Sequence, residues 1–328
     1  MKPDIKRVKS LYGVQSFDAA TAYAKKHFTD AGGIILARSL EHVSPEIFTQ
    51  EFAGLTFLQQ GIEINNEGGY ASIIRKLKLR TEGDFRESGS NTNTTGSITL
   101  SGEDDSIPVS TMDAESHWTE IDLKQAERDN RNLPSLFFEA HAERYNRKID
   151  DLGYLGQVRT DGSQKTTGLL NYAGFASGGS GGITAASASG QELYDEIAEL
   201  ITAQWAGVLN VDTYKADRVV MPASVYNICS TKILNSAGSE MSVLRALQSN
   251  FPTVTFGLTT KAESAGAGGV SVTVAFSSNR RALQFRLPVP LNVSSVDQRG
   301  FKYYVESYFG VAGLDVIEED AARILIGL

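Results

Sequence analysis

The stretch GGSGG at residues 178–182 matches the G-x-S-x-G pattern, which places a nucleophilic serine on a sharp turn between a strand and a helix. Such a serine also needs a histidine later in the chain to take its proton. Low-complexity sequence flanks Ser180 on both sides, and all four histidines precede it. We therefore interpret this stretch as a flexible glycine-rich loop and not as a catalytic turn.

The other residues with chemical potential also lack the spacing of a site. His27, His42, His117 and His141 are far apart, with no H-E-x-x-H pattern and no cysteines at zinc spacing. His141 falls on the apolar stripe of a predicted helix, which favours a hydrogen-bonded core histidine over a metal ligand. Cys229 has no basic or histidine neighbours that would activate its thiol, and no nucleotide-binding fingerprint occurs. The sequence predicts no enzyme activity, no cofactor and no metal.

Charged residues of both signs are concentrated on two strand-like segments between residues 67 and 112. The first, YASIIRKLKLRT at residues 70–81, alternates apolar and basic residues with the period of a β-strand. The returning segment carries an acidic run, and the tip between them has one large apolar residue. The side chains that we expect to contact a neighbouring copy are Arg75, Lys76, Lys78, Arg80, Phe85, Glu103, Asp104 and Asp105.

The basic strand face has more than one interpretation. It is a solvated edge, because lysines protect strand edges from unwanted pairing, or it pairs with acidic residues of a neighbour. Contact with nucleic acid is less favoured, because the formal net charge is −8 and the pI is about 5.2. A long hairpin with one solvated face and a polar tip is marginal in water unless something covers it. We therefore expect another copy of the chain to supply the missing surface.

Composition is that of a folded protein without membrane segments. The chain has 328 residues, of which 41% are hydrophobic and 21% charged. The single cysteine excludes an intrachain disulfide and fits a reducing cytoplasm. The basic N-terminus has no apolar run typical of a secretory signal, and no apolar run is long enough to span a bilayer. We expect a soluble, cytoplasmic protein.

Helices and strands are interspersed without a βαβ rhythm, which predicts the α+β class. The strongest helical pattern runs from Pro134 to Leu152, with Gly153 as its stop. Residues 168–190 are rich in glycine and are typical of a mobile loop or domain boundary. An amphipathic helix follows over Gln191–Val208, and the chain is mainly β from Gly269 to its end. Short helices are predicted around residues 16–32 and after Ser44.

The order of these elements resembles the major capsid proteins of tailed phages, which have the Hong Kong phage-type fold. Several segments are similar to one branch of that family, formerly described as a domain of unknown function. The segments that carry the resemblance are ILARSLEHVSPEIFTQEFAGLTFL, EAHAERYNRKIDDLGYLG, GLLN, RVVMPASVYNI and FRLPVPLNVSSVDQRGFKYYVESYFGVAGLDVIEEDAARIL.

The resemblance implies a division of the chain into regions. These are an N-terminal arm over 1–66, an extended loop over 67–112, a peripheral domain over 113–190 with a spine helix over 134–152, an axial domain over 191–289, and C-terminal strands over 290–328 that return to the peripheral domain. In the family the extended loop lies over the adjacent subunit.

The resemblance also implies a function and partners. Family members form hexamers and pentamers that close into an icosahedral shell around double-stranded DNA. Expected partners are further copies of the chain, a portal, a separate scaffold protein and decoration proteins, with assembly in the host cytoplasm and no membrane contact. The alternatives are an encapsulin-like nanocompartment shell and a soluble α+β enzyme. The enzyme would need a concave site with convergent ionisable groups, and the sequence shows none.

Overall fold

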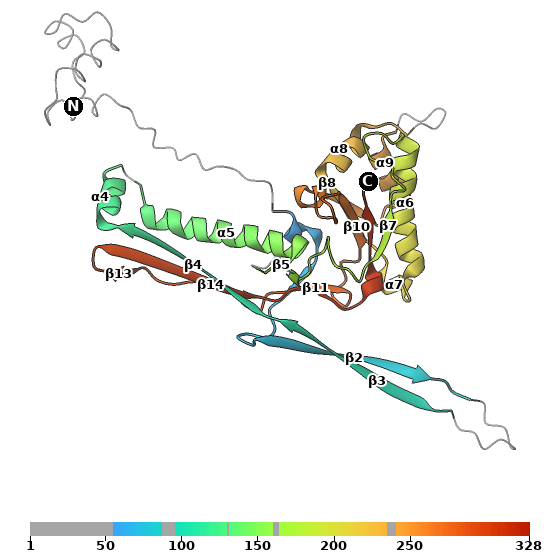
Figure 1. Ribbon diagram of the computed structural model, residues 1–328, viewed down its shortest axis with the longest axis horizontal. Helices are drawn as coiled ribbons and strands as arrows, with labels where there is room; N and C mark the ends of the chain where they lie inside the picture. Colours follow the sequence, from blue (N-terminus) through green and yellow to red (C-terminus); the bar gives the residue numbers. More distant parts are fainter. Residues whose placement is uncertain (1–54, 87–95, 130, 160–163, 235–240) are drawn as a thin grey trace, which may run out of the picture. The chain divides into compact units, whose positions relative to one another are not determined.

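The computed structural model (Figure 1) describes residues 55–86, 96–129, 131–159, 164–234 and 241–328. The short helices predicted before residue 55 lie outside these residues, as does most of the hairpin tip. The chain divides into two units, and the smaller one comprises Met1–Glu51 and Gln125–Arg131. The larger unit comprises Phe52–Lys124 and Asn132–Leu328 and contains the features that follow. Helix α4 covers residues Glu120–Arg128.

The segment with charges of both signs forms an antiparallel hairpin, as predicted. Strand β2 (Ile73–Gly83) pairs with β3 (Ile98–Pro108) along its whole length. Both strands have 11 residues, and in the described part of the chain they form a sheet of only two strands. The chain then continues into β4 (Ser110–Thr119). The hairpin is therefore a single layer attached to the rest of the unit at one end (Figure 1).

Helix α5 (Leu133–Leu155) lies along one face of an antiparallel sheet (Figure 1). In this sheet β14 (Lys302–Val311) pairs with β4 on one side and with β12 (Val289–Val293) and β13 (Asp297–Arg299) on the other. Aromatic contacts join the two layers: the Trp118 ring stacks on Phe137 at 4.8 Å, and Tyr145 meets Phe309 edge-on at 5.0 Å. The predicted long helix is confirmed.

The prediction that Gly153 ends this helix is wrong. The helix continues to Leu155, and its C-cap is Gly156, whose φ of 72° is a left-handed value that favours glycine. Gly153 lies inside the last turn, where an added Cβ would be 2.5 Å from the ring of Phe57. A glycine is needed at this position because a side chain packs against the backbone, and not because the helix stops.

A small three-stranded sheet contributes to the hydrophobic core in which the C-terminal part of α5 packs. Strand β1 (Glu63–Asn65) runs parallel to β11 (Leu283–Arg286), which pairs antiparallel with β15 (Gly313–Val316). The Phe57 ring lies 5.3 Å from Tyr154 and 5.2 Å from Phe285. Phe57 and Ile62, which immediately precedes β1, thus pack in a hydrophobic core, although the resemblance assigns residues 1–66 to an arm.

A five-stranded sheet with three helices forms a second hydrophobic core. The strand order is β7 (Ala176–Gly179), β16 (Ala322–Ile326), β10 (Val272–Phe276), β8 (Arg218–Pro222) and β9 (Thr255–Thr259). The helices are α6 (Gly190–Gly207), α8 (Ala223–Thr231) and α9 (Val243–Asn250). The predicted amphipathic helix is confirmed in α6, which begins at a capping box made by Ser189 and Glu192.

The pairing of this sheet differs from the sequence prediction at two points. The glycine-rich stretch is not a loop throughout, because residues 176–179 form the edge strand β7, parallel to β16. Strand β16, predicted to return to the peripheral domain, pairs with β10 in the sheet of the predicted axial domain. Strand β7 consists of Ala, Ser and Gly, whose small side chains give no strand pattern in the sequence. The strand forms through backbone pairing with β16. The predicted domain limits stay predictions, but strand pairing crosses two of them.

Short elements complete the described part of the chain: η1 (Phe57–Gln60), β5 (Gln157–Val158), β6 (Gln164–Thr166), α7 (Val211–Tyr214), η2 (Thr260–Glu263) and η3 (Glu319–Ala321). Helices and strands are interspersed throughout, which confirms the predicted α+β class.

Candidate assembly surface

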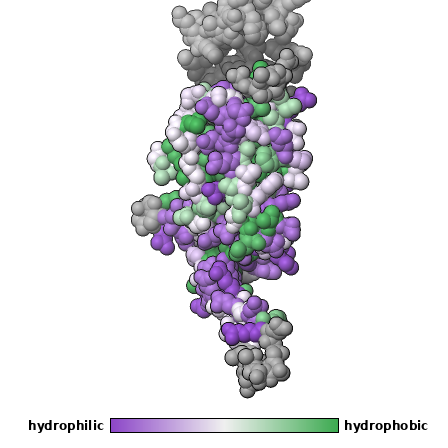
Figure 2. Space-filling view, turned by 90° about the vertical axis from the view of Figure 1, so that its right-hand side faces the viewer, coloured by the Kyte–Doolittle hydropathy of each residue, from purple (hydrophilic) through white to green (hydrophobic). Residues whose placement is uncertain are grey.

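The hairpin has two faces of opposite character, because residues directly across from each other share a face. On one face Lys76 lies opposite Asp105 and Lys78 lies opposite Glu103, so each lysine of β2 faces an acidic residue of β3. On the other face Ile73 lies at the base of the hairpin, and four further large apolar side chains lie toward the tip, each more than half exposed: Leu77, Leu79, Ile98 and Leu100. Figure 2 shows mainly hydrophilic residues on the side of the hairpin that it presents.

The polar face, not the apolar face, is turned toward the body of the larger unit. Along β2 the half-buried positions are Ile74, Lys76 and Lys78, while Leu77 and Leu79 between them are 64% and 58% exposed. A strand of a self-contained protein buries its apolar face. Here the apolar face of the hairpin is exposed to solvent, and within the described residues nothing covers it. We call Leu77, Leu79, Ile98 and Leu100 the leucine face.

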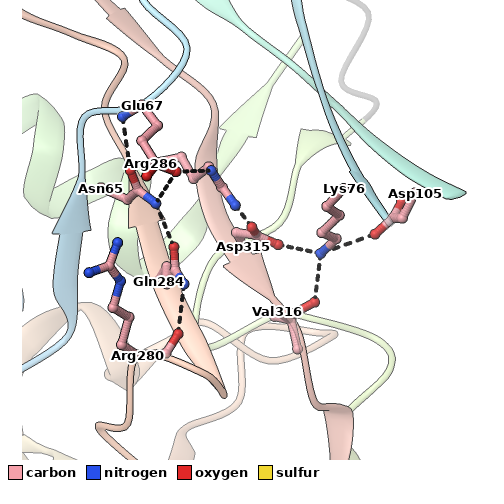
Figure 3. A network of polar contacts seen from close by, with 9 residues as sticks. All are labelled: Asn65, Glu67, Lys76, Asp105, Arg280, Gln284, Arg286, Asp315 and Val316. Atoms are coloured by element: carbon pink, nitrogen blue, oxygen red, sulfur yellow. Dashed lines mark hydrogen bonds and ion pairs between the residues drawn. The ribbon is translucent and has the colours of Figure 1, made fainter. Parts of the chain in front are cut away.

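The charges predicted to reach a neighbour find partners within the chain at the base of the hairpin. Lys76 Nζ lies 3.1 Å from Asp105 Oδ2, and it also donates to Asp315 and to the Val316 carbonyl oxygen at 2.9 Å (Figure 3). Arg75 Nη1 lies 3.8 Å from Asp104 on the exposed side. Only 13% of the Lys76 side chain is exposed, so this lysine is a bridge between hairpin and body.

Electrostatics at this bridge favours the ionised form of Asp105. Partial burial acts to raise the pKa of the carboxyl, but the hydrogen bond and the positive charge of Lys76 outweigh burial, and the pKa is lowered. Lys76 therefore holds Asp105 as a carboxylate.

Polar contacts continue from Lys76 into the body. Asp315 is fully buried and accepts a hydrogen bond of 2.7 Å from Arg286 Nε. Arg286 Nη1 lies 3.8 Å from Glu67, which precedes the hairpin. Figure 3 shows these side chains converging from β2, β3, β11 and β15. We call Lys76, Asp105, Asp315, Arg286 and Glu67 the root network.

The remaining predicted contact residues stay available to another molecule. Arg80, Glu103 and Asp104 are exposed, and Phe85 is 86% exposed at the end of the described strand. Lys78 is half-buried. Sequence reasoning missed the leucine face and the partners Asp315 and Arg286. The period-2 pattern contained the leucines, but a pattern does not say which face meets the body.

The groups first considered for chemistry are occupied by structural contacts. Ser180 is buried, and its hydroxyl donates to the Gly327 carbonyl oxygen at 2.9 Å. His141 is buried, and its two ring nitrogens lie 2.8 Å from Ser116 Oγ and 2.7 Å from Ser307 Oγ, which confirms a core histidine. Burial raises the pKa of the Cys229 thiol to about 11.

The described part of the chain has neither a cluster of metal ligands nor a helix that could span a membrane. It contains no group of three or more His, Cys, Asp and Glu side chains placed to hold a metal ion. It also contains no helix that is both long and apolar enough to cross a bilayer.

The α+β fold with its projecting hairpin is that of proteins that build phage capsid shells from copies of one chain. The chain belongs to the major capsid protein family, whose model matches residues 88–327. It is the major capsid protein of a tailed phage, and thus a component of the virion. The resemblance inferred from the sequence is confirmed.

Solved structures agree with this assignment. The chain is 74% identical to a chain in the capsid of Myoviridae phage XM1, with a TM-score of 0.81, covering 90% of this chain and 100% of that one. A chain in the capsid of an empty GTA particle is 14% identical, with a TM-score of 0.62 and coverage of 90% and 97%. A chain of Mycobacterium phage Ogopogo is 10% identical, with a TM-score of 0.59 and coverage of 88% and 96%. The last two show the shared fold. No curated protein matches this chain.

Proposed function

We propose that copies of this chain form hexamers and pentamers that close into an icosahedral shell around double-stranded DNA. The hairpin of each copy lies across the adjacent copy, and the leucine face of that hairpin is buried against the neighbour's surface. The observation that carries this proposal is the orientation of the hairpin, whose polar face meets its own body while four large apolar side chains face outward. Fully burying one such side chain contributes about 1.5–3 kcal/mol, and closed symmetry repeats the contact around each ring.

The proposed partners follow from the same assignment. A portal, a separate scaffold protein and decoration proteins would join the shell, and assembly would take place in the host cytoplasm. The DNA is enclosed without sequence-specific binding, in keeping with a formal net charge of −8. The chain acts as a structural protein and not as an enzyme.

One experiment tests the leucine face against the charged face. A double variant, Leu77→Gln with Leu79→Gln, removes apolar area without touching the root network. We expect unassembled subunits of this variant to unfold at the same urea concentration as the wild type, while the yield of closed particles in electron micrographs falls at least about tenfold.

The matched variant is Lys78→Gln with Arg80→Gln, on the opposite face of the same strand. We expect a smaller loss of particles, because exposed ion pairs contribute little. Loss of particles in this variant, with normal particles in the leucine variant, would show that charge and not apolar contact makes the interface. A coarser test deletes residues 83–96. The subunit should stay folded but assemble poorly, and normal particles from the deletion would refute the role of the hairpin.

A further inference from the structure

The hairpin is tied to the body through the ion pair of Lys76 with buried Asp315 and the hydrogen bond of Lys76 to the Val316 carbonyl oxygen. Asp315, on β15, contacts Lys76 with one carboxylate oxygen and Arg286 with the other. Its own side chain is 0% exposed, and those of Lys76 and Arg286 are 13% and 10% exposed. A buried carboxylate is tolerated only when cations and hydrogen bonds satisfy it, so moving Lys76 away would leave Asp315 short of one partner.

Lys76 stands near the limit of contact between β2 and the body. Beyond Lys78 every residue of β2 is exposed. On the β3 side, Asp105 is bound to the same ammonium group, so both strands are attached to Asp315 through one atom, Lys76 Nζ. On the other side of Asp315, Arg286 reaches Glu67 in the segment that leads into the hairpin.

The backbone at the entrance to the hairpin would not fix its direction by itself. Gly68 and Gly69 precede β2 with φ values of 114° and 52°. These conformations are accessible to glycine at little cost, and an added Cβ at Gly69 would meet nothing within 4 Å. At its entrance the direction of the arm therefore depends on side-chain contacts near its base, while at its exit only Val109 separates β3 from β4, which pairs with β14.

We propose that Asp315 and Lys76 are positioning residues for assembly: their buried ion pair fixes the direction of the hairpin in the single subunit, before any partner binds. A preorganised arm loses less conformational entropy when it binds a neighbour, so association becomes more favourable. This inference rests on the proposed role of the hairpin as the contact between copies.

The test measures the direction of the hairpin in the full-length, unassembled subunit by double electron–electron resonance (DEER) spectroscopy, which gives the distribution of distances between two spin labels. Spin labels are placed at Ser101→Cys in β3 and Ala142→Cys in α5, which are both exposed, and the buried Cys229 is replaced by alanine. We expect a narrow distance distribution in this background. A broad one would overturn the proposal without any further variant.

Variants then locate the cause. Lys76→Met should widen the distribution at least twofold and slow particle formation, and Asp315→Asn should widen it in the same direction. Lys76→Arg, which keeps a cation within reach, should restore the narrow distribution. A matched control, Arg75→Met, breaks an ion pair that lies within the hairpin and outside the root network, and it should leave the distribution narrow.

The outcomes separate this inference from the proposed function. An unchanged distribution in Lys76→Met, with a normal melting temperature of the body, would refute the positioning role even if wild-type particles form. Equal widening by Arg75→Met would show a general loosening of the hairpin and would also refute it. Absence of particles from the wild type would instead count against the proposed function.

Discussion

Strands β10 and β2 show two ways in which this chain stabilises a β-strand. All five residues of β10 are buried, because β8 and β16 flank it and side chains of both hydrophobic cores cover its faces. Of the 11 residues of β2, none is buried, and it has one neighbour, β3. Both strands are rich in apolar residues. The difference teaches that β10 is completed by its own chain, whereas β2 leaves one face to solvent, where the proposed function places another copy.

The largest contrast should come from aromatic residues in the two regions. Phe276 on β10 is fully buried, and Phe276→Ala should lower the free energy of unfolding by about 3–5 kcal/mol because it leaves a cavity. Phe85→Ala removes a ring that is 86% exposed and should change the free energy of unfolding by less than about 0.5 kcal/mol. Urea unfolding of unassembled subunits measures both. A cost above about 1 kcal/mol for Phe85→Ala would mean that the tip packs on its own chain.

Added methyl groups sharpen the same contrast. Gly153→Ala places a Cβ 2.5 Å from the ring of Phe57, and we expect a loss of about 1–3 kcal/mol from overpacking. Gly102→Ala, in the hairpin, meets the ends of Leu77 and Leu79 at 3.3 Å and the Lys78 carbonyl oxygen at 4.0 Å, which is ordinary contact. The two leucine side chains are exposed and can move, so the change should stay within about 0.5 kcal/mol. Equal losses in the two variants would contradict the view that only the body is close-packed.

Thiol reactivity gives the smallest but most local test. Burial raises the pKa of Cys229 to about 11 from an ordinary value of 9.0, so the folded state holds the thiol proton more tightly than the unfolded state. This contribution to stability is complete below pH 9 and is lost as the pH rises toward 11.

At pH 8, native Cys229 should react with a disulfide reagent at least about a hundredfold more slowly than in urea, because reaction requires opening of the body. A cysteine introduced at Ser101 in the hairpin should react as fast in the native subunit as in urea. Rapid labelling of native Cys229 would show that the body around α8 opens easily.

The candidate surface was only partly predictable from sequence. The period-2 pattern of β2 and β3 predicted the hairpin and the need for a covering surface. The pattern left the basic face to solvent or to a neighbour, whereas Lys76 pairs with Asp105 and Asp315 of its own chain. The same pattern is symmetric between the two faces of a strand, so it could not show that the leucines face outward and the lysines face the body. That choice depends on Asp315, which lies 239 residues from Lys76 in the sequence.

The amino-acid sequence by itself determined the local elements of this protein: the long helix α5, the amphipathic helix α6 and the α+β class. These follow from periodicity and capping, which act within a few residues. Tertiary structure alone decided that Gly153 accommodates Phe57, that the glycine-rich stretch supplies strand β7, and that Lys76 joins Asp315. Each of these depends on a partner distant in the chain, and only folding brings such partners within contact distance.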